Sequence, residues 1–121
     1  MDKLLSGRRV LVVEDEILVL MMIEDMLSDL GCQSVISAAT IGQAITLIKA
    51  QIFDAAMLDM NLDGDDSNTV ADALAERGVP FIYSTGNSDR DMRKGFSDRA
   101  VLRKPFSFDE LTSKLERLLS G

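Results

Sequence analysis

Ala55-Ala56-Met57-Leu58-Asp59 is a short apolar run that ends in a carboxylate. Continuous apolar runs of this length are typical of strands buried inside a parallel sheet. A carboxylate is costly inside a core, so we expect Asp59 to lie exposed at the point where the strand ends. An acid in that position indicates a functional site.

Polar residues also follow three other apolar runs. Glu14 and Asp15 follow Val10–Val13, Ser84 and Thr85 follow Phe81–Tyr83, and Lys104 comes shortly after Val101–Leu102. In an open parallel sheet the ligand site lies beyond the carboxyl ends of the strands. We therefore expect four strand ends to meet at one acidic pocket that faces one lysine.

The apolar pattern alternates along the chain between short continuous runs and helical spacing, which indicates repeated strand–helix units around a parallel sheet. The predicted strands cover about Arg9–Val13, Ser34–Ala38, Asp54–Leu58, Pro80–Ser84 and Ala100–Arg103. A polar loop is predicted over Asn61–Asn68. The whole chain, residues 1–121, is interpreted as one domain.

Helical spacing predicts one buried stripe in each main helix. The stripes are Val19, Met22, Ile23, Met26, Leu27 and Leu30; Ile41, Ala44, Ile45 and Ile48; Val70, Ala71, Ala73 and Leu74; and Phe108, Leu111, Leu115 and Leu118. The methionines of the first helix, Met21 included, are interpreted mainly as core filling. Thr40 is expected to cap a helix, and Gly31 and Gly78 to end one. Residues 89–96 offer only two apolar anchors, which predicts a short helix that moves.

The composition limits the classes of function. A length of 121 residues with 46% hydrophobic residues suffices for one core without disulfides. The net charge of -7, from 20 acidic and 13 basic residues, argues against direct binding to nucleic acid or anionic membranes. There is one cysteine, the first residues lack a secretory signal, and no apolar run approaches the roughly 20 residues that span a bilayer. We therefore expect a cytoplasmic protein.

The acids at the predicted pocket are suited to a metal ion. Glu14, Asp15 and Asp59 would repel one another, and a hard divalent cation removes that conflict. Mg²⁺ is the predicted cofactor, because it takes one or two carboxylates, several waters and a phosphoryl oxygen. The backbone carbonyl of Asn61 is a further candidate ligand. Glu16, by contrast, is interpreted only as a first-turn acid favoured by the helix dipole.

One carboxylate of the pocket remains free to react. An aspartate oxygen is a competent nucleophile toward phosphorus when cationic or hydroxyl groups neutralise the phosphoryl oxygens. Asp59 is the candidate nucleophile, and Lys104 and Thr85 are the candidate donors. The pocket is therefore suited to phosphoryl transfer.

The residues from Asp59 onward also match the first seven positions of a calcium-binding EF-hand loop. The match fails at Asp66, where an apolar residue belongs, and at Val70, where the motif requires a glutamate. The preceding residues predict a strand rather than a helix. The remaining acids of this loop are interpreted as solvated.

Taken in order, the motifs resemble the receiver domain of two-component response regulators from end to end. They are Val12-Val13-Glu14-Asp15-Glu16, Asp59, Ser84-Thr85-Gly86 and Lys104-Pro105-Phe106. The resemblance implies a flavodoxin-like α/β fold, with a doubly wound five-stranded parallel sheet in the order 2-1-3-4-5 and helices on both faces. It also implies a cis peptide bond between Lys104 and Pro105.

The same resemblance implies a role for each matched residue. Asp59 would be the phosphoacceptor, Asp15 a direct Mg²⁺ ligand, and Glu14 a ligand acting directly or through water. Thr85 would donate a hydrogen bond to a phosphoryl oxygen, and Lys104 would pair with that group.

The chain departs from the usual receiver pattern at two places. Val101 stands where receivers usually carry the Phe or Tyr that swings inward on activation, and Asp63-Gly64 replaces a typical loop proline. Together with Pro80–Gly86, they resemble a receiver subclass whose fourth strand ends in a Phe-Ala-Thr-Gly type motif, although Tyr83 and Ser84 replace the Phe and Ala. Without the aromatic switch, we expect activation to move the backbone after Gly86.

The function implied is a signalling switch rather than a metabolic enzyme. Asp59 would receive a phosphoryl group from the phosphohistidine of a sensor histidine kinase or phosphotransfer protein, and would lose it by hydrolysis. Because the chain stops after its last predicted helix, output is expected through a downstream protein target.

Two other functions compete with this one. The first is a receiver-like docking or decoy module for a kinase, which is never phosphorylated. The second is a phosphatase with an aspartyl nucleophile, which would need another acid two residues after Asp59, where this chain has Asn61.

Overall fold

A computed structural model describes residues 3–62, 65–85 and 101–119. Along these residues the elements are β1 (Arg9–Val13), α1 (Ile17–Asp29), β2 (Ser34–Ala38), α2 (Ile41–Ala50), β3 (Ala55–Asp59), β4 (Asn61–Leu62), β5 (Asp65–Asp66), α3 (Asn68–Glu76), β6 (Phe81–Thr85), β7 (Val101–Arg103) and α4 (Phe108–Leu119). The predicted strands are therefore present, with ends that shift by a residue.

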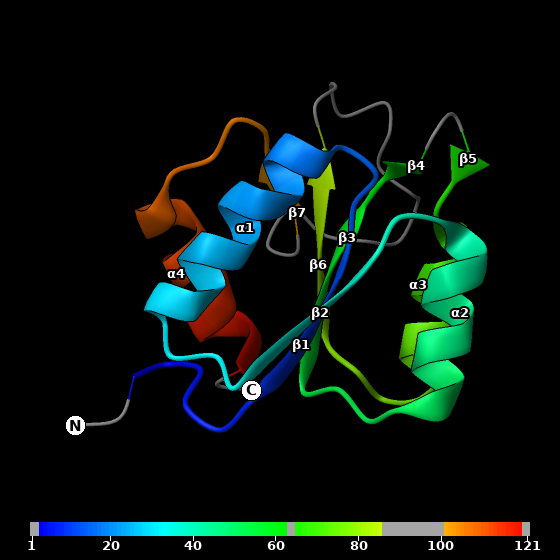
Figure 1. Cartoon of the computed structure of the whole chain (residues 1–121), viewed down its shortest axis with the longest axis horizontal. Helices are drawn as coiled ribbons and strands as arrows, with labels where there is room; N and C mark the ends of the chain where they lie inside the picture. Colours follow the sequence, from blue (N-terminus) through cyan, green and yellow to red (C-terminus); the bar gives the residue numbers. More distant parts are fainter. Residues whose placement is uncertain (1–2, 63–64, 86–100, 120–121) are drawn as a thin grey trace.

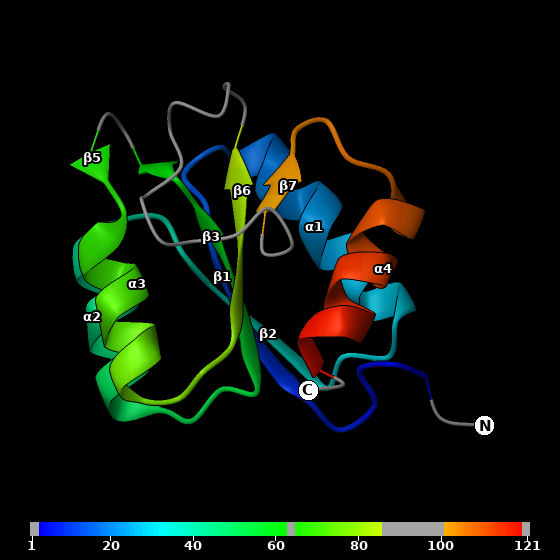
Figure 2. The ribbon, with the colours of Figure 1, turned by 180° about the vertical axis from the view of Figure 1, so that it is seen from behind.

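The main sheet is five-stranded and parallel, in the order β2-β1-β3-β6-β7. Helices α1 and α4 cover one face of this sheet, and α2 and α3 cover the other (Figures 1 and 2). This confirms the predicted fold and strand order. The helix predicted over residues 89–96 lies outside the described residues.

Strand alternation divides the core into two layers. Leu11, Leu58 and Tyr83 pack with α2 and α3. The alternate residues of the same strands, Val12, Met57 and Ile82, pack with α1 and α4. Both faces of the sheet are covered, so the central strands are apolar at nearly every position, as in β3.

Three sequence predictions about the elements were wrong in detail. Phe108, expected in the core, is 38% exposed because α4 begins at this residue. In α1 the predicted stripe does pack against the core, but Leu20 is buried as well, and Met21, interpreted as core filling, is 54% exposed. The predicted polar loop after β3 contains a small antiparallel pair, β4 and β5.

The predicted helix ends are confirmed. The Thr40 hydroxyl accepts a hydrogen bond from the Gln43 amide at 3.1 Å and so caps α2. Gly31 follows α1 with a φ of +85°, and a Cβ there would lie 2.9 Å from the Cβ of Lys3.

Among the described residues, no helix is long and apolar enough to cross a membrane.

Candidate phosphoryl-transfer site

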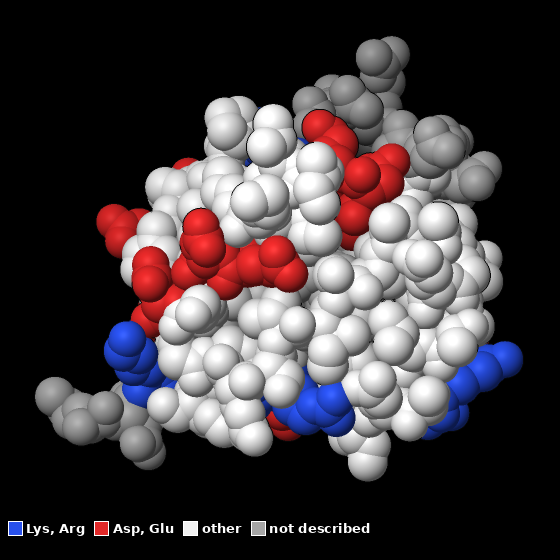
Figure 3. Space-filling view, in the orientation of Figure 1, with Lys and Arg blue, Asp and Glu red and all other residues white. Residues whose placement is uncertain are grey.

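One row of residues crosses the carboxyl edge of the sheet. Val13 of β1 pairs with Leu58 of β3, so Glu14 and Asp59 are the next residues of that register. Asp59 pairs in turn with Ser84 of β6. The strand ends predicted to meet are thus neighbours on three adjacent strands, at the edge where acidic side chains gather in Figure 3.

Four carboxylates lie together at this edge. Oxygen atoms from Glu14, Asp15, Glu16 and Asp59 are all within 4.8 Å of one another. Two of these acids are buried, Glu14 at 2% and Asp59 at 5% exposure, while Asp15 and Glu16 lie outside. The site therefore consists of two buried acids and two exposed acids beside them.

Asp59 itself corrects a sequence expectation. It was expected to lie exposed beyond the strand, but it is the last residue of β3 and is almost completely buried. The cost of burying a carboxylate here is offset by a cation that comes from another strand.

Lys104 supplies that cation. Its Nζ lies 2.9 Å from Glu14 Oε1, 3.4 Å from Asp59 Oδ2 and 4.0 Å from Glu16 Oε1. Its backbone amide donates a 2.7 Å hydrogen bond to the carbonyl of Thr85, which holds the start of the β7–α4 loop against β6. The lysine side chain therefore crosses β6 to reach Asp59, the last residue of β3, and Glu14, the residue after β1.

The environment shifts the pKa values of the two closest partners upward. Burial raises the pKa of Glu14, the nearby Lys104 lowers it in part, and the charge of Asp59 raises it again. Burial alone would lower the pKa of Lys104, but Glu14 and Asp59 together bring it above its ordinary value. The pocket thus favours the charged lysine and disfavours the ionised form of Glu14.

Replacing Glu14 with glutamine should stabilise the metal-free protein at neutral pH. Because the folded pKa of Glu14 exceeds its ordinary value of 4.5, its ionisation costs stability as the pH rises through that folded pKa. We expect Glu14→Gln to melt at a higher temperature than the wild type at pH 7 in EDTA, and this advantage to shrink as the pH falls toward 4.5. Thermal unfolding at several pH values measures this, and a lower melting temperature for the variant at pH 7 would contradict it.

The other predicted site residues lie nearby. Thr85 is the last residue of β6 and is 2% exposed. The backbone of Asn61 begins β4, two residues after Asp59. The predicted cis peptide bond between Lys104 and Pro105 is confirmed. The chemical roles of these residues, and those of Glu14, Asp15, Asp59 and Lys104, stay predictions.

Glu16, which the sequence analysis left out of the predicted metal ligands, belongs to the acidic group. It immediately precedes α1, yet its side chain makes no capping hydrogen bond to the helix. Its backbone amide instead donates to Glu14 Oε2 at 3.2 Å, and its carboxylate belongs to the acidic group. The available signal was its position beside Glu14 and Asp15 in the turn that leaves β1.

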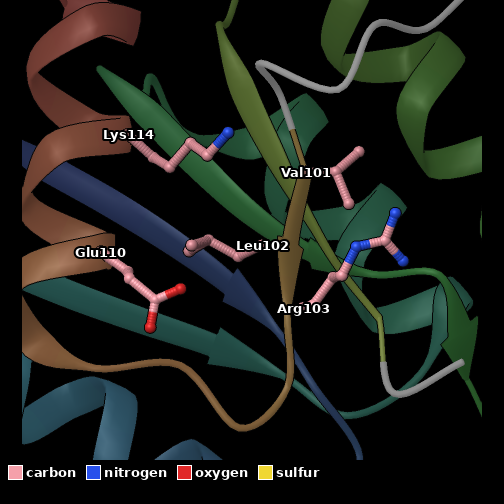
Figure 4. A pocket seen from close by; sticks show the side chains of 5 residues that line it. All are labelled: Val101, Leu102, Arg103, Glu110 and Lys114. Carbon is pink, nitrogen blue, oxygen red and sulfur yellow. The ribbon is translucent and has the colours of Figure 1, made fainter.

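A separate hollow of about 330 Å³ lies between β7 and α4. Figure 4 shows Leu102 pointing toward Glu110 and Lys114 of α4, while Val101 and Arg103 point to the other side of the strand. None of the four acids lines it. It is therefore not the site of the predicted chemistry.

The donor set fits a Mg²⁺ ion. All four acids offer oxygen atoms, the ligand type that Mg²⁺ prefers. The buried Glu14 Oε1 accepts no hydrogen bond of good geometry among the described residues. Its contact with Lys104 Nζ, at 2.9 Å, is an ion pair. The exposed Asp15 leaves one side open for water, which Mg²⁺ retains.

Comparison with known proteins identifies the class. The family model of the response regulator receiver domain matches residues 10–116. The chain belongs to this family, whose members are the receiver domains of two-component response regulators. The comparisons do not test the subclass suggested by the fourth strand, which stays a prediction.

Particular relatives agree with this membership. SdrG from Sphingomonas melonis Fr1 has a solution structure that is 42% identical, with a TM-score of 0.84 over 96% of this chain and 98% of that one. A BeF3-activated conformation of SdrG from Pseudomonas melonis Fr1 has a TM-score of 0.80 over 94% of this chain and 98% of that one. The receiver domain of a sensor histidine kinase from Pseudomonas aeruginosa, with magnesium coordinated in its active-site cleft, is 30% identical, with a TM-score of 0.82 over 96% and 100%.

The curated relatives are longer proteins. The transcriptional regulatory protein PdtaR of Mycobacterium tuberculosis is 31% identical over 93% of this chain but only 57% of its own length. The chain spans about half the length of the curated relatives it matches.

Proposed function

We propose that this receiver domain accepts a phosphoryl group on Asp59 from a phosphohistidine of a sensor histidine kinase or phosphotransfer protein. Mg²⁺ is required, and the phosphorylated form acts on a downstream protein. The observation that carries the proposal is Lys104, which bridges Asp59 and Glu14 within a group of four carboxylates. A lysine held over a buried aspartate is suited to neutralising a group added to that aspartate.

The transfer step uses groups already in contact. An oxygen of Asp59 attacks phosphorus, the P–N bond to the donor imidazole breaks, and the nitrogen keeps the electron pair. Lys104 Nζ lies 3.4 Å from Asp59 Oδ2, and this proximity supports a pairing with a phosphoryl oxygen once the carboxylate has reacted. A bound Mg²⁺, held by Asp15, Asp59, the Asn61 carbonyl and Glu14 directly or through water, would neutralise phosphoryl charge.

The domain would not turn over a metabolite. Hydrolysis of the acyl phosphate returns Asp59 to its carboxylate, so the only substrate consumed is the phosphoryl group of the donor. The switch cannot use an aromatic residue at position 101, where a valine is 6% exposed and pairs with Tyr83. The movement expected over residues 86–96 lies outside the described residues and stays a prediction.

The experiment that tests the proposal is labelling by a small phosphodonor. Wild-type protein treated with phosphoramidate and Mg²⁺ should gain the mass of one phosphoryl group, and EDTA should prevent this. A folded protein that stays unlabelled at saturating Mg²⁺ would favour the docking or decoy function. Continuous release of phosphate from unrelated esters would instead favour a phosphatase.

Mg²⁺ should stabilise the wild type and much less the variant Asp15→Asn. Binding to the native state alone adds about 2.7 kcal/mol at a hundred times the dissociation constant, or about 10 °C for a domain of this size. A hundredfold weaker site would retain less than about 0.5 kcal/mol of this effect. Thermal unfolding with and without Mg²⁺ measures the shift.

The matched control for this prediction is Asp25→Asn. It makes the same chemical change at an exposed position of α1 outside the acidic group. Its Mg²⁺ shift should equal that of the wild type. Equal shifts in all three proteins would remove Asp15 from the ligand set.

A further inference from the structure

Glu16 lies on the exposed side of the acidic group. Its side chain is 68% exposed, and its Oε1 lies 4.0 Å from Lys104 Nζ. Its own backbone amide is anchored on Glu14 Oε2 at 3.2 Å. The Glu16 carboxylate therefore lies on the exposed side of the acidic group, whereas Asp59 is 5% exposed.

The charges at this edge do not balance. In the metal-loaded group, where a divalent ion favours the ionised form of all four carboxylates, the Lys104 cation and the two charges of the metal leave one negative charge in excess. Removal of Glu16 alone would make the metal-loaded group neutral. The proposed mechanism gives a role to the other three acids of the group but not to Glu16. The charge of Glu16 therefore acts on an approaching phosphodonor rather than on the bound metal ion.

We propose that Glu16 is a specificity residue that selects the phosphodonor by charge. It disfavours donors that arrive as dianions and favours donors in which a positive charge is joined to the phosphoryl group, as in a protonated phosphohistidine. The inference rests on the proposed phosphoryl transfer. It adds that the charge of Glu16 slows the phosphorylation of Asp59 by small dianionic acyl phosphates.

Two small donors separate these charge classes. Acetyl phosphate is a dianion at neutral pH; its P–O bond breaks and acetate leaves with the electron pair. Phosphoramidate carries an ammonium group on phosphorus and has one net negative charge; its P–N bond breaks and ammonia leaves. In both reactions an oxygen of Asp59 forms the new P–O bond, so only the charge and leaving group of the donor differ.

The experiment measures initial labelling rates with both donors at saturating Mg²⁺ and low salt. In Glu16→Gln the rate with acetyl phosphate should rise about fourfold and that with phosphoramidate about twofold, so their ratio should double. Glu16→Lys should raise the ratio about fourfold. At 1 M salt, where charges are screened over roughly 3 Å, the ratios should approach that of the wild type.

Glu116→Gln is the matched control, because it removes the same charge near the last turn of α4, beside Leu4 and Arg8 at the other end of the sheet. Its ratio should not change. Unchanged ratios in both Glu16 variants, or an equal change in Glu116→Gln, would overturn the assignment to Glu16. Wild-type protein labelled by neither donor would contradict the phosphoryl transfer itself, and thermal unfolding verifies that each variant is folded.

Discussion

Asp59→Asn should abolish labelling by phosphoramidate, with a rate at least about a thousandfold below that of the wild type. The carboxamide retains the shape of the side chain but offers no anionic oxygen to attack phosphorus. The fold should survive, because Lys104 keeps its closer partner Glu14 at 2.9 Å. Intact-mass measurement over time with Mg²⁺ gives the rate.

The control for this loss is again Asp25→Asn, which leaves the acidic group intact. It should be labelled at the wild-type rate. Persistent stoichiometric labelling of Asp59→Asn at another side chain would show that Asp59 is not the phosphoacceptor.

Lys104→Met should lower the labelling rate by about a hundredfold to a thousandfold, the usual effect of removing one donor that stabilises transition-state charge. Methionine keeps the apolar stem but not the ammonium. The same change removes the Lys104 cation from the buried Glu14 and Asp59, so the free energy of unfolding at neutral pH should fall by about 1–3 kcal/mol. Labelling kinetics and denaturant unfolding measure the two effects separately.

A double variant separates chemistry from stability. Lys104→Met combined with Glu14→Gln removes a buried negative charge and should recover part of the lost stability, but not the labelling rate. Lys49→Met, at an exposed position in the last turn of α2, is the control and should change neither quantity appreciably. Recovery of labelling together with stability would mean that Lys104 only supports the fold.

The strands and helices could be anticipated because they depend on patterns carried by single segments, whereas the order of the strands followed from the resemblance to receiver domains. β3 is apolar at every position before Asp59, and each helix shows a stripe at helical spacing. The residues at the carboxyl ends of these strands follow from the topology alone. Positions with this kind of local signal were predicted within a residue.

The burial of Asp59 could not be anticipated in this way. It depends on Lys104, which directly follows β7 and reaches over the intervening strand β6. The grouping of Glu16 with the other acids depends likewise on the turn between β1 and α1 rather than on its helix. Phe108 was misjudged because helical spacing does not reveal where a helix begins.

The Lys104 side chain can cross β6 only if the residue at position 84 is small. Ser84 is the β6 residue in register with both Asp59 and Leu102, it is 2% exposed, and it is small. A leucine or phenylalanine at this position would keep every acid and the lysine in the sequence but obstruct the route between them. Whether this edge of the sheet can hold a charged group on Asp59 therefore depends on the side-chain volume of residue 84, which carries no charge.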